Sequence, residues 1–353
     1  MQNLPGQNPI QLEHLTAALH GDSQRFGELT EPFRRELQVH CYRILGSLHE
    51  AEDMVQETML RAWKRLETYE GRASFRSWLY KIATNACLDV LDQRRSRRLL
   101  PNQWGPASDP HVQITPPSQE MVWLEPIPDE WLGDLSAQSP ESRYTESESI
   151  SFAFLTALQA LPPRQRAVLI LRDVLDFSAN DTAEVLELTV SSVNSALHRA
   201  RTALSQRYQG CEPEASLRSP TDEKTQRLLD HFVKAWERAD VDGLVALLKE
   251  DAAFAMPPSP SWYQGSEAIR AFAESTVFAD DGMFGGKAVG RWKLRRTNAN
   301  GSPAFIIYQR TETDQYRAFG IHVLEKSGDK LSLVTSFIDP SLPSRFGFPE
   351  ILE

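Results

Sequence analysis

The hydrophobic pattern divides the first hundred residues of the chain into amphipathic helices. Apolar residues recur three and four positions apart in three segments, residues 26–37, 55–66 and 75–91. The last segment runs into the basic sequence QRRSRR, which suits both a helix C-terminus and phosphate groups. The pattern predicts an all-helical domain over residues 10–98.

Proline and polar residues replace the helical pattern over residues 99–150, which also contain the acidic sequence EPIPDEWLGDL. This composition predicts a mostly irregular linker. Large apolar residues are unusual in a simple spacer, and they predict that the linker docks on another surface. These residues are Trp104, Trp123, Trp131 and Leu132.

Helical periodicity returns over residues 151–209. A helix over residues 179–186, a short turn and a second helix over residues 191–207 have the spacing of a helix-turn-helix. Ser178 and Asp181 resemble a capping box at the start of the first of these helices. The arrangement predicts contact with DNA, with the N-terminus of the second helix facing the base edges.

A second linker over residues 210–223 precedes an α+β pattern over residues 224–353. Amphipathic helices are predicted near residues 228–236 and 244–248. Alternating segments such as PAFIIYQRT and LSLVTSFID follow within residues 291–338 and predict strands. The expected fold class is therefore multidomain, with two all-α domains followed by one α+β domain.

Charge is distributed unevenly along the 353 residues, which are enough for two or three domains. The formal net charge is -10 at pH 7. Residues 99–150 carry about -8, while the helical segments on either side are each near +1. A helix that contacts DNA can therefore be locally basic within an acidic chain, although isolated DNA binding should be weak.

The cysteines and the apolar runs exclude several classes of protein. Three cysteines lie far apart and lack the spacing of metal ligands, so we expect neither a disulfide framework, nor a metal site, nor a cofactor. The sequence has no apolar run of membrane-spanning length and no signal pattern at its N-terminus. We expect a cytoplasmic protein without a membrane partner.

The segment EDMVQETMLRAWKRLETYEGRASFRSWLYKIATNACLDVL resembles the second conserved region of bacterial sigma factors, in the extracytoplasmic-function (ECF, group IV) subfamily of the sigma-70 family. The resemblance implies that its first helix binds core RNA polymerase at the beta-prime clamp. The implied polymerase contacts are Asp53, Gln56, Glu57, Arg61 and Trp63. A solvated helix with ordinary ion pairs is the alternative interpretation.

The same resemblance implies that the following segment opens promoter DNA near position -10 and traps an unstacked base. Such a site needs stacking rings, hydrogen-bonding groups and cations. The implied DNA contacts are Ser74, Phe75, Arg76, Trp78, Lys81, Asn85, Arg94 and Arg95, with Arg97 and Arg98 completing the basic cluster. Asn85 is implied to read the flipped base, and a core position remains the alternative for Trp78.

The segment LPPRQRAVLILRDV and the helix-turn-helix are similar to the fourth region of the same family. This similarity implies recognition of promoter DNA near -35 and contact with the beta flap of the polymerase. The implied DNA contacts are Ser191, Ser192, Asn194, Ser195, Arg199 and Arg201. Short side chains approach base edges closely, and asparagine suits adenine. Many family members have a basic residue in place of Asn194, which leaves the preferred promoter open.

Family members pass the linker through the basic active-site cleft and RNA exit path of the polymerase. An acidic segment with tryptophans suits such a surface electrostatically. An inert spacer is the alternative interpretation of residues 99–150.

The C-terminal segment resembles a SnoaL-like domain of the nuclear-transport-factor-2-like superfamily, in HFVKAWERADVDGLVALLKEDAAFAMPP and WYQGSEAIRAFA. The resemblance implies a cone-shaped α+β domain whose pocket is lined by Trp262, Tyr263, Trp292, Tyr308, His322 and Asp339. Such a domain could regulate the sigma segments in cis and sense a small ligand. It could instead act as an isomerase or cyclase with His322 and Asp339 as acid and base. A core or rim histidine is the plainer interpretation of His322.

The predicted function is therefore an RNA polymerase sigma factor that directs promoter-specific initiation. Its C-terminal domain is expected to modulate this activity in cis, and the chain is expected to have no catalytic residues. The competing hypothesis is a metabolite-binding or catalytic tail that the sigma segments target. A stand-alone repressor is a weaker hypothesis, because the clamp-helix resemblance and the lack of a dimerisation segment argue against it.

Overall fold

The computed structural model forms two compact units, each built from two stretches of the chain. The first contains Met1–Arg97 and Trp131–Cys211, and the second contains Arg98–Glu130 and Glu212–Glu353. The structure describes residues 9–93, 97–117, 122–132, 144, 148–207 and 223–352. The second linker, expected over residues 210–223, therefore lies almost wholly outside the described residues. Within the described part of the chain, no helix is long and apolar enough to cross a membrane.

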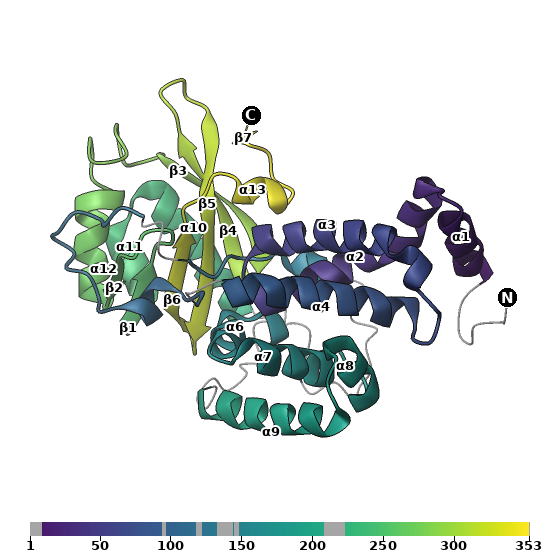
Figure 1. Ribbon diagram of the computed structural model, residues 1–353. Helices are drawn as coiled ribbons and strands as arrows, with labels where there is room; N and C mark the ends of the chain where they lie inside the picture. Colours follow the sequence, from purple (N-terminus) through teal and green to yellow (C-terminus); the bar gives the residue numbers. More distant parts are fainter. Residues whose placement is uncertain are drawn as a thin grey trace. The chain divides into compact units, whose positions relative to one another are not determined.

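The N-terminal half of the first unit is helical, as the apolar periodicity predicts (Figure 1). Its helices are α1 (Pro9–Leu19), α2 (Ser23–Leu45), α3 (Leu48–Lys64) and α4 (Phe75–Gln93), with a 3-10 turn at Leu66–Thr68. Gly46 ends α2 with a positive φ of 72°, and the Ser47 side chain caps α3. This tight connection packs α2 against α3.

The C-terminal half of the first unit contains the helix-turn-helix. Its elements are η3 (Glu148–Ile150), α6 (Phe152–Gln159), α7 (Pro163–Leu169), η4 (Ile170–Val174), α8 (Ala179–Leu186) and α9 (Val190–Arg207). The N-cap expected at Ser178 is present, because its Oγ accepts a hydrogen bond from the Asp181 amide at 3.1 Å. Val193 and Leu197 pack inward, so the opposite face of α9 is exposed.

A buried arginine joins the two halves of the first unit. Arg166 on α7 donates to the carbonyl oxygen of Ile44, at the end of α2, at 2.5 Å and to Oε1 of Gln159 at 2.8 Å. The ring of Phe177, just before α8, packs against Tyr80 of α4 with centroids 5.1 Å apart. The Arg166 bonds hold α7 at the end of α2, and the Phe177 contact holds the start of α8 against α4.

The second unit is a mixed sheet with helices packed on it (Figure 1). The strands follow the order β2-β1-β6-β5-β4-β3, with β7 paired to β5, and among the described strands only β1 and β6 are parallel. The strands are β1 (Leu248–Ala255), β2 (Trp262–Gln264), β3 (Trp292–Ala299), β4 (Ser302–Arg310), β5 (Tyr316–Ser327), β6 (Lys330–Phe337) and β7 (Ile351–Leu352). The helices are α10 (Glu223–Arg238), α11 (Val241–Ala246), α12 (Ser266–Phe272) with η5 (Ala273–Val277), and α13 (Leu342–Arg345).

The expected α+β elements of this unit form, with one correction. The helix expected near residues 244–248 is wrong at its end, because α11 stops at Ala246 and Leu248 begins β1. Ala252 and Phe254 of β1 join the core, and pairing with β6 supplies the backbone hydrogen bonds that a longer helix would have made. The core packs α10 against one face of the sheet through Leu228, Phe232 and Trp236.

The first part of the linker between the helical halves belongs to the second unit. Trp123 is buried and donates from Nε1 to the Pro258 carbonyl oxygen at 2.9 Å. Trp262 of β2 donates from Nε1 to the Gly105 carbonyl oxygen at 3.0 Å. Further along, the amide of Ile127 donates to Oδ1 of Asn300 at 3.0 Å. The linker contains a short helix, α5 (Pro101–Trp104). The linker tryptophans were expected to dock on another surface. For Trp123, that surface is the C-terminal domain of the same chain.

Trp123→Ala should loosen this docked segment. The variant loses a buried indole and its hydrogen bond, which together stabilise the segment by about 3 kcal/mol. Limited proteolysis of the full chain should then cut within residues 98–130 at least about tenfold faster. Val112→Ala is the matched control, because Val112 lies in the same segment and is 64% exposed. Equal cleavage rates in both variants would contradict the assigned role of Trp123.

Candidate nucleic-acid interface

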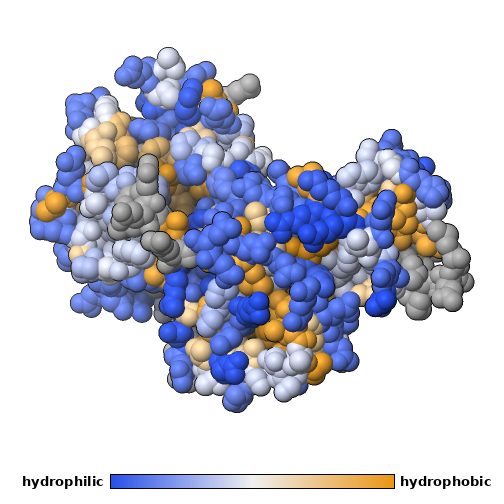
Figure 2. Space-filling model, in the orientation of Figure 1, coloured by the Kyte–Doolittle hydropathy of each residue, from blue (hydrophilic) through white to orange (hydrophobic). Residues whose placement is uncertain are grey.

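The outward face of α3 combines charged residues with an exposed leucine. Asp53 and Gln56 are exposed, as a binding surface requires. Hydrophilic residues dominate the surface over α3 (Figure 2), and Leu60, at 55% exposure, is the apolar exception. The sequence analysis missed Leu60, although its spacing from Gln56 places both on one helical face.

The other residues expected on this face are held by their neighbours. Arg61 pairs through Nε with Glu57 at 2.6 Å and through Nη1 with Asp89 at 3.1 Å. Trp63 packs on Phe26 with ring centroids 5.1 Å apart. These side chains shape and brace the α3 surface.

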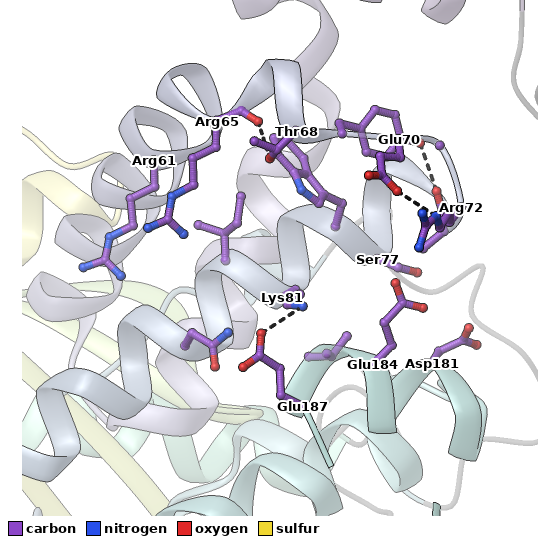
Figure 3. A pocket seen from close by; sticks show the side chains of 17 residues that line it. Arg61, Arg65, Thr68, Glu70, Arg72, Ser77, Lys81, Asp181, Glu184 and Glu187 are labelled. Atoms are coloured by element: carbon purple, nitrogen blue, oxygen red, sulfur yellow. Dashed lines mark hydrogen bonds and ion pairs between the residues drawn. The ribbon is translucent and has the colours of Figure 1, made fainter. Parts of the chain in front are cut away.

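A cavity of about 400 Å³ lies beside α4, and three of the residues expected to bind DNA near -10 line it (Figure 3). Trp78, Lys81 and Asn85 all line it. The rings of Trp78 and Tyr69 lie 5.4 Å apart at its wall. Aromatic faces, an amide and a cation together can stack a base, bond its edge and attract its phosphate.

The loop between α3 and α4 supplies a second wall that the sequence analysis missed. Seven residues of this loop line the cavity and precede the predicted set: Arg65, Thr68, Tyr69, Glu70, Gly71, Arg72 and Ala73. Gly71 has a φ of 71°, which allows the tight loop. The glycine between charged residues in YEGRA was the available signal for this loop.

Three residues expected at the same site point elsewhere. Ser74 caps α4, because its Oγ accepts from the Ser77 amide at 3.0 Å, and Phe75 is buried. Arg76 pairs with Glu36 at 2.9 Å. Burial opposes its charge, but Tyr80 and Glu36 outweigh burial and raise the pKa of the guanidinium. Arg94 and Arg95 lie outside the described residues.

Three acidic residues of the helix-turn-helix complete the cavity: Asp181, Glu184 and Glu187. Figure 3 shows them projecting from α8 and the turn that follows it. Lys81 Nζ lies 3.1 Å from Oε1 of Glu187. Glu187 ends α8 in the left-handed region, with φ 54° and ψ 46°. The cavity therefore has an aromatic side with several cations and Glu70, and an opposite side with three carboxylates.

The exposed face of α9 presents five of the six residues expected near -35. Ser191, Ser192, Asn194, Ser195 and Arg199 are all exposed. The sixth, Arg201, turns inward and makes two hydrogen bonds to Asp173, at 2.8 and 2.5 Å. Hydrogen bonding to Asp173 raises the pKa of Arg201 despite the opposing effect of burial. Arg201 thus braces the helix-turn-helix.

The six residues expected to line a pocket in the second unit do not form one pocket. Neighbouring residues of a strand point to opposite faces of the sheet, which separates Trp262 from Tyr263. Tyr263 and Trp292 belong to the main core, whereas Trp262 belongs to a separate small cluster. Burial raises the pKa of Tyr263 to about 12.

Two of the remaining residues have local structural contacts. Tyr308 donates from its hydroxyl to the Pro349 carbonyl oxygen at 2.8 Å. Asp339 accepts hydrogen bonds from both the amide and the hydroxyl of Ser341. These contacts fix the C-terminal turn of the domain.

His322 is fully buried among aromatic rings. Its ring centroid lies 4.3 Å from that of Trp236 and 5.8 Å from that of Phe232. Neither ring nitrogen of His322 has a hydrogen-bond partner within the described part of the chain. Burial lowers the pKa of His322 to about 3. A neutral imidazole that lacks hydrogen bonds to protein groups and is enclosed by rings is poorly placed for acid–base chemistry.

Family models match three parts of the chain. They are Sigma-70 region 2 over residues 29–97, Sigma-70 region 4 over residues 151–204 and a SnoaL-like domain over residues 229–334. The regions that line the cavity and carry the α9 face are thus the two sigma regions.

Individual proteins match over longer stretches. The chain is 42% identical over 330 residues to the ECF RNA polymerase sigma factor SigG of Mycobacterium tuberculosis, covering 93% of this chain and 85% of that protein. It is 28% identical over 184 residues to the ECF RNA polymerase sigma factor SigW of Bacillus subtilis, covering 52% of this chain and 89% of the relative. The crystal structure of the Mycobacterium tuberculosis sigma factor SigJ shares the fold, with a TM-score of 0.53, 20% identity and coverage of 91% and 98% of the two chains.

His322→Phe should make the second unit less sensitive to acid. Because its pKa is lowered to about 3, folded His322 binds fewer protons than unfolded histidine between pH 6.5 and 3. The contribution of neutral His322 to the free energy of unfolding is therefore lost as the pH falls through this window. Phenylalanine removes this loss, which amounts to about 1–2 kcal/mol at pH 5.

Urea unfolding of the full chain at pH 7 and pH 5 measures this effect. His231→Phe, at an exposed position of α10, controls for the general effect of the substitution. An equal loss of stability by the wild type and by His322→Phe between pH 7 and pH 5 would contradict the prediction.

Proposed function

Because the chain belongs to the ECF sigma factors of RNA polymerase, we propose that its three surfaces divide the work of promoter-specific initiation. The α3 face binds the polymerase, the cavity beside α4 holds an unstacked promoter base, and the α9 face reads the upstream element. The observation that carries this proposal is the cavity itself, where Trp78, Lys81 and Asn85 meet around a space of about 400 Å³.

Polymerase binding is assigned to Asp53, Gln56 and Leu60 on the outward face of α3. Exposed leucine among polar residues is typical of a protein interface, in which one apolar anchor is surrounded by hydrophilic contacts. Arg61 supports the surface through its pairs with Glu57 and Asp89. The expected partner surface is the beta-prime clamp of the core enzyme.

Base capture is assigned to the cavity and its loop. A base taken from the DNA stack is stabilised by aromatic faces and by hydrogen bonds to its edge. Tyr69 and Trp78 supply the faces, Asn85 supplies donor and acceptor groups, and Lys81 supplies a cation for the backbone. Arg65 of the α3–α4 loop extends the phosphate-binding surface, whereas Arg72 pairs with Glu70 at 2.6 Å.

Upstream recognition is assigned to the exposed N-terminal half of α9. Ser191, Asn194 and Ser195 are short polar side chains that can approach base edges in the major groove. Arg199 lies further along the same face and is suited to a phosphate or to guanine. Arg201 is withdrawn from this set, because Asp173 holds it.

The C-terminal domain is assigned a regulatory role in cis. The segment it holds, Arg98–Glu130, is the start of the connection between the two sigma regions. While Trp123 and Ile127 remain bonded to this domain, that segment is not available to enter the polymerase. We assign no catalytic step to the domain, because His322 is enclosed and has no partner within the described residues.

Leu60→Ser should weaken binding to purified core RNA polymerase by about tenfold, because it removes the apolar anchor of the α3 surface. The exposed side chain is not part of the core, so thermal stability should remain unchanged. Fluorescence anisotropy with labelled full-length protein measures the affinity. Val289→Ser is the control, since Val289 is 64% exposed and lies in the C-terminal domain. Failure of the wild-type chain to bind core polymerase would refute the proposed function.

A further inference from the structure

The cavity beside α4 is shared by the two regions that would read separate promoter elements. Elements near -10 and -35 are about 25 base pairs apart, which is roughly 85 Å of duplex. Ser191, at the start of the α9 reading face, follows Glu187 of the cavity wall by four residues and therefore lies within about 15 Å of it. With α8 packed at the cavity, the two reading surfaces cannot reach both elements together. The helix-turn-helix must leave the cavity before promoter DNA can occupy it.

Glu187 stands where the backbone favours glycine. It ends α8 with a left-handed conformation, φ 54° and ψ 46°, that side chains with a Cβ adopt at a cost. Asp176 has the same φ of 54°, so the role of Glu187 depends on where its side chain reaches and not on the backbone alone. The side chain of Glu187 extends to Lys81, with 3.1 Å between Oε1 and Nζ (Figure 3).

The chemistry of this contact resembles that of bound DNA. A carboxylate beside Lys81 satisfies the same cation that a phosphate would. Asp181 and Glu184 add negative charge to the same wall. We propose that Asp181, Glu184 and Glu187 form an acidic lid that competes with single-stranded promoter DNA for the cavity, with Glu187 as its main contact. This inference rests on the proposed function, because it assigns the regulation of the base-capturing site.

The lid is suited to reversible closure. The Lys81 side chain is 34% exposed and that of Glu187 is 72% exposed, so solvent screens their attraction. Such a pair contributes little to folding, yet it places negative charge where a phosphate must enter. Promoter DNA and polymerase together can displace it, whereas DNA alone binds weakly.

Glu187→Gly and Glu187→Gln separate backbone strain from charge. Glycine relieves the left-handed strain and removes the carboxylate, while glutamine removes the charge alone. Asp176→Gly is the matched control, because Asp176 is exposed, also has a φ of 54° and does not line the cavity. The probe is a fluorescein-labelled oligo(dT) of about 20 nucleotides, which binds through stacking and phosphate contacts without needing a promoter sequence.

Both Glu187 variants should bind the probe about threefold to fivefold more tightly than the wild type at low salt. The gain should shrink at about 0.3 M salt, and Asp176→Gly should bind like the wild type. In a Lys81→Gln background the gain should disappear, because the cation for which the carboxylate and phosphate compete is absent.

Equal binding by Glu187→Gly, Glu187→Gln and the wild type would overturn the lid. Tighter probe binding that persists in the Lys81→Gln background would also overturn it, because the effect would then arise at α9 and not at the cavity. Binding of the same full-length proteins to core polymerase keeps the two proposals apart. If the wild type binds polymerase but the Glu187 variants bind the probe like the wild type, only the lid proposal fails. If the wild type does not bind polymerase, the proposed function fails.

Discussion

The hydrogen bonds of the buried Arg166 guanidinium determine how the first unit is assembled. Its Nη atoms donate to the oxygen atoms of Ile44, Gln159 and Leu161, which ties α7 to the end of α2. Burial of a guanidinium costs free energy that hydrogen bonds offset, so the four bonds of the Nη atoms restrict where α7 can pack. Once α7 is held there, Phe177 reaches Tyr80 and α8 reaches α4. The cavity and its acidic wall follow from this one contact.

Acidic residues of the chain lie at two places where they have structural contacts. Much of the negative charge lies between the sigma regions, and the first part of that segment is bonded to the C-terminal domain through Trp123 and Ile127. Three further carboxylates face the cavity, where one of them pairs with Lys81. In both places the acidic residues lie where we expect the binding of polymerase or of DNA to be regulated. An acidic protein can thus keep a DNA-binding surface while limiting its use in isolation.

The C-terminal domain keeps the SnoaL-like framework but fills its centre with aromatic rings. Phe232 and Trp236 of α10 lie against His322 of β5, and burial keeps the imidazole neutral. An interior of this kind is suited to a stable platform. The outer contacts of the domain, including Trp262 with Gly105, provide the surface on which the linker is held.

Local sequence predicted most of the helices and strands of this protein, and it was also enough to indicate the family. The three-and-four spacing of apolar residues predicts α2 to α4, and the Ser178 cap marks the start of α8. Exposed positions on α9 also follow from that spacing, which is why Ser191, Asn194 and Arg199 were predicted correctly as surface residues. These features depend on residues that are neighbours in the chain.

Only the tertiary structure decided which charges are available and which surfaces are covered. Arg76 and Arg201 have the sequence signature of DNA contacts, but Glu36 and Asp173 hold them. Strand alternation and distant packing likewise separate Trp262 from His322. Partners such as Lys81 and Glu187 are more than a hundred positions apart in the sequence, so no local period can reveal them. Their pairing depends on the buried contacts that bring α8 to α4.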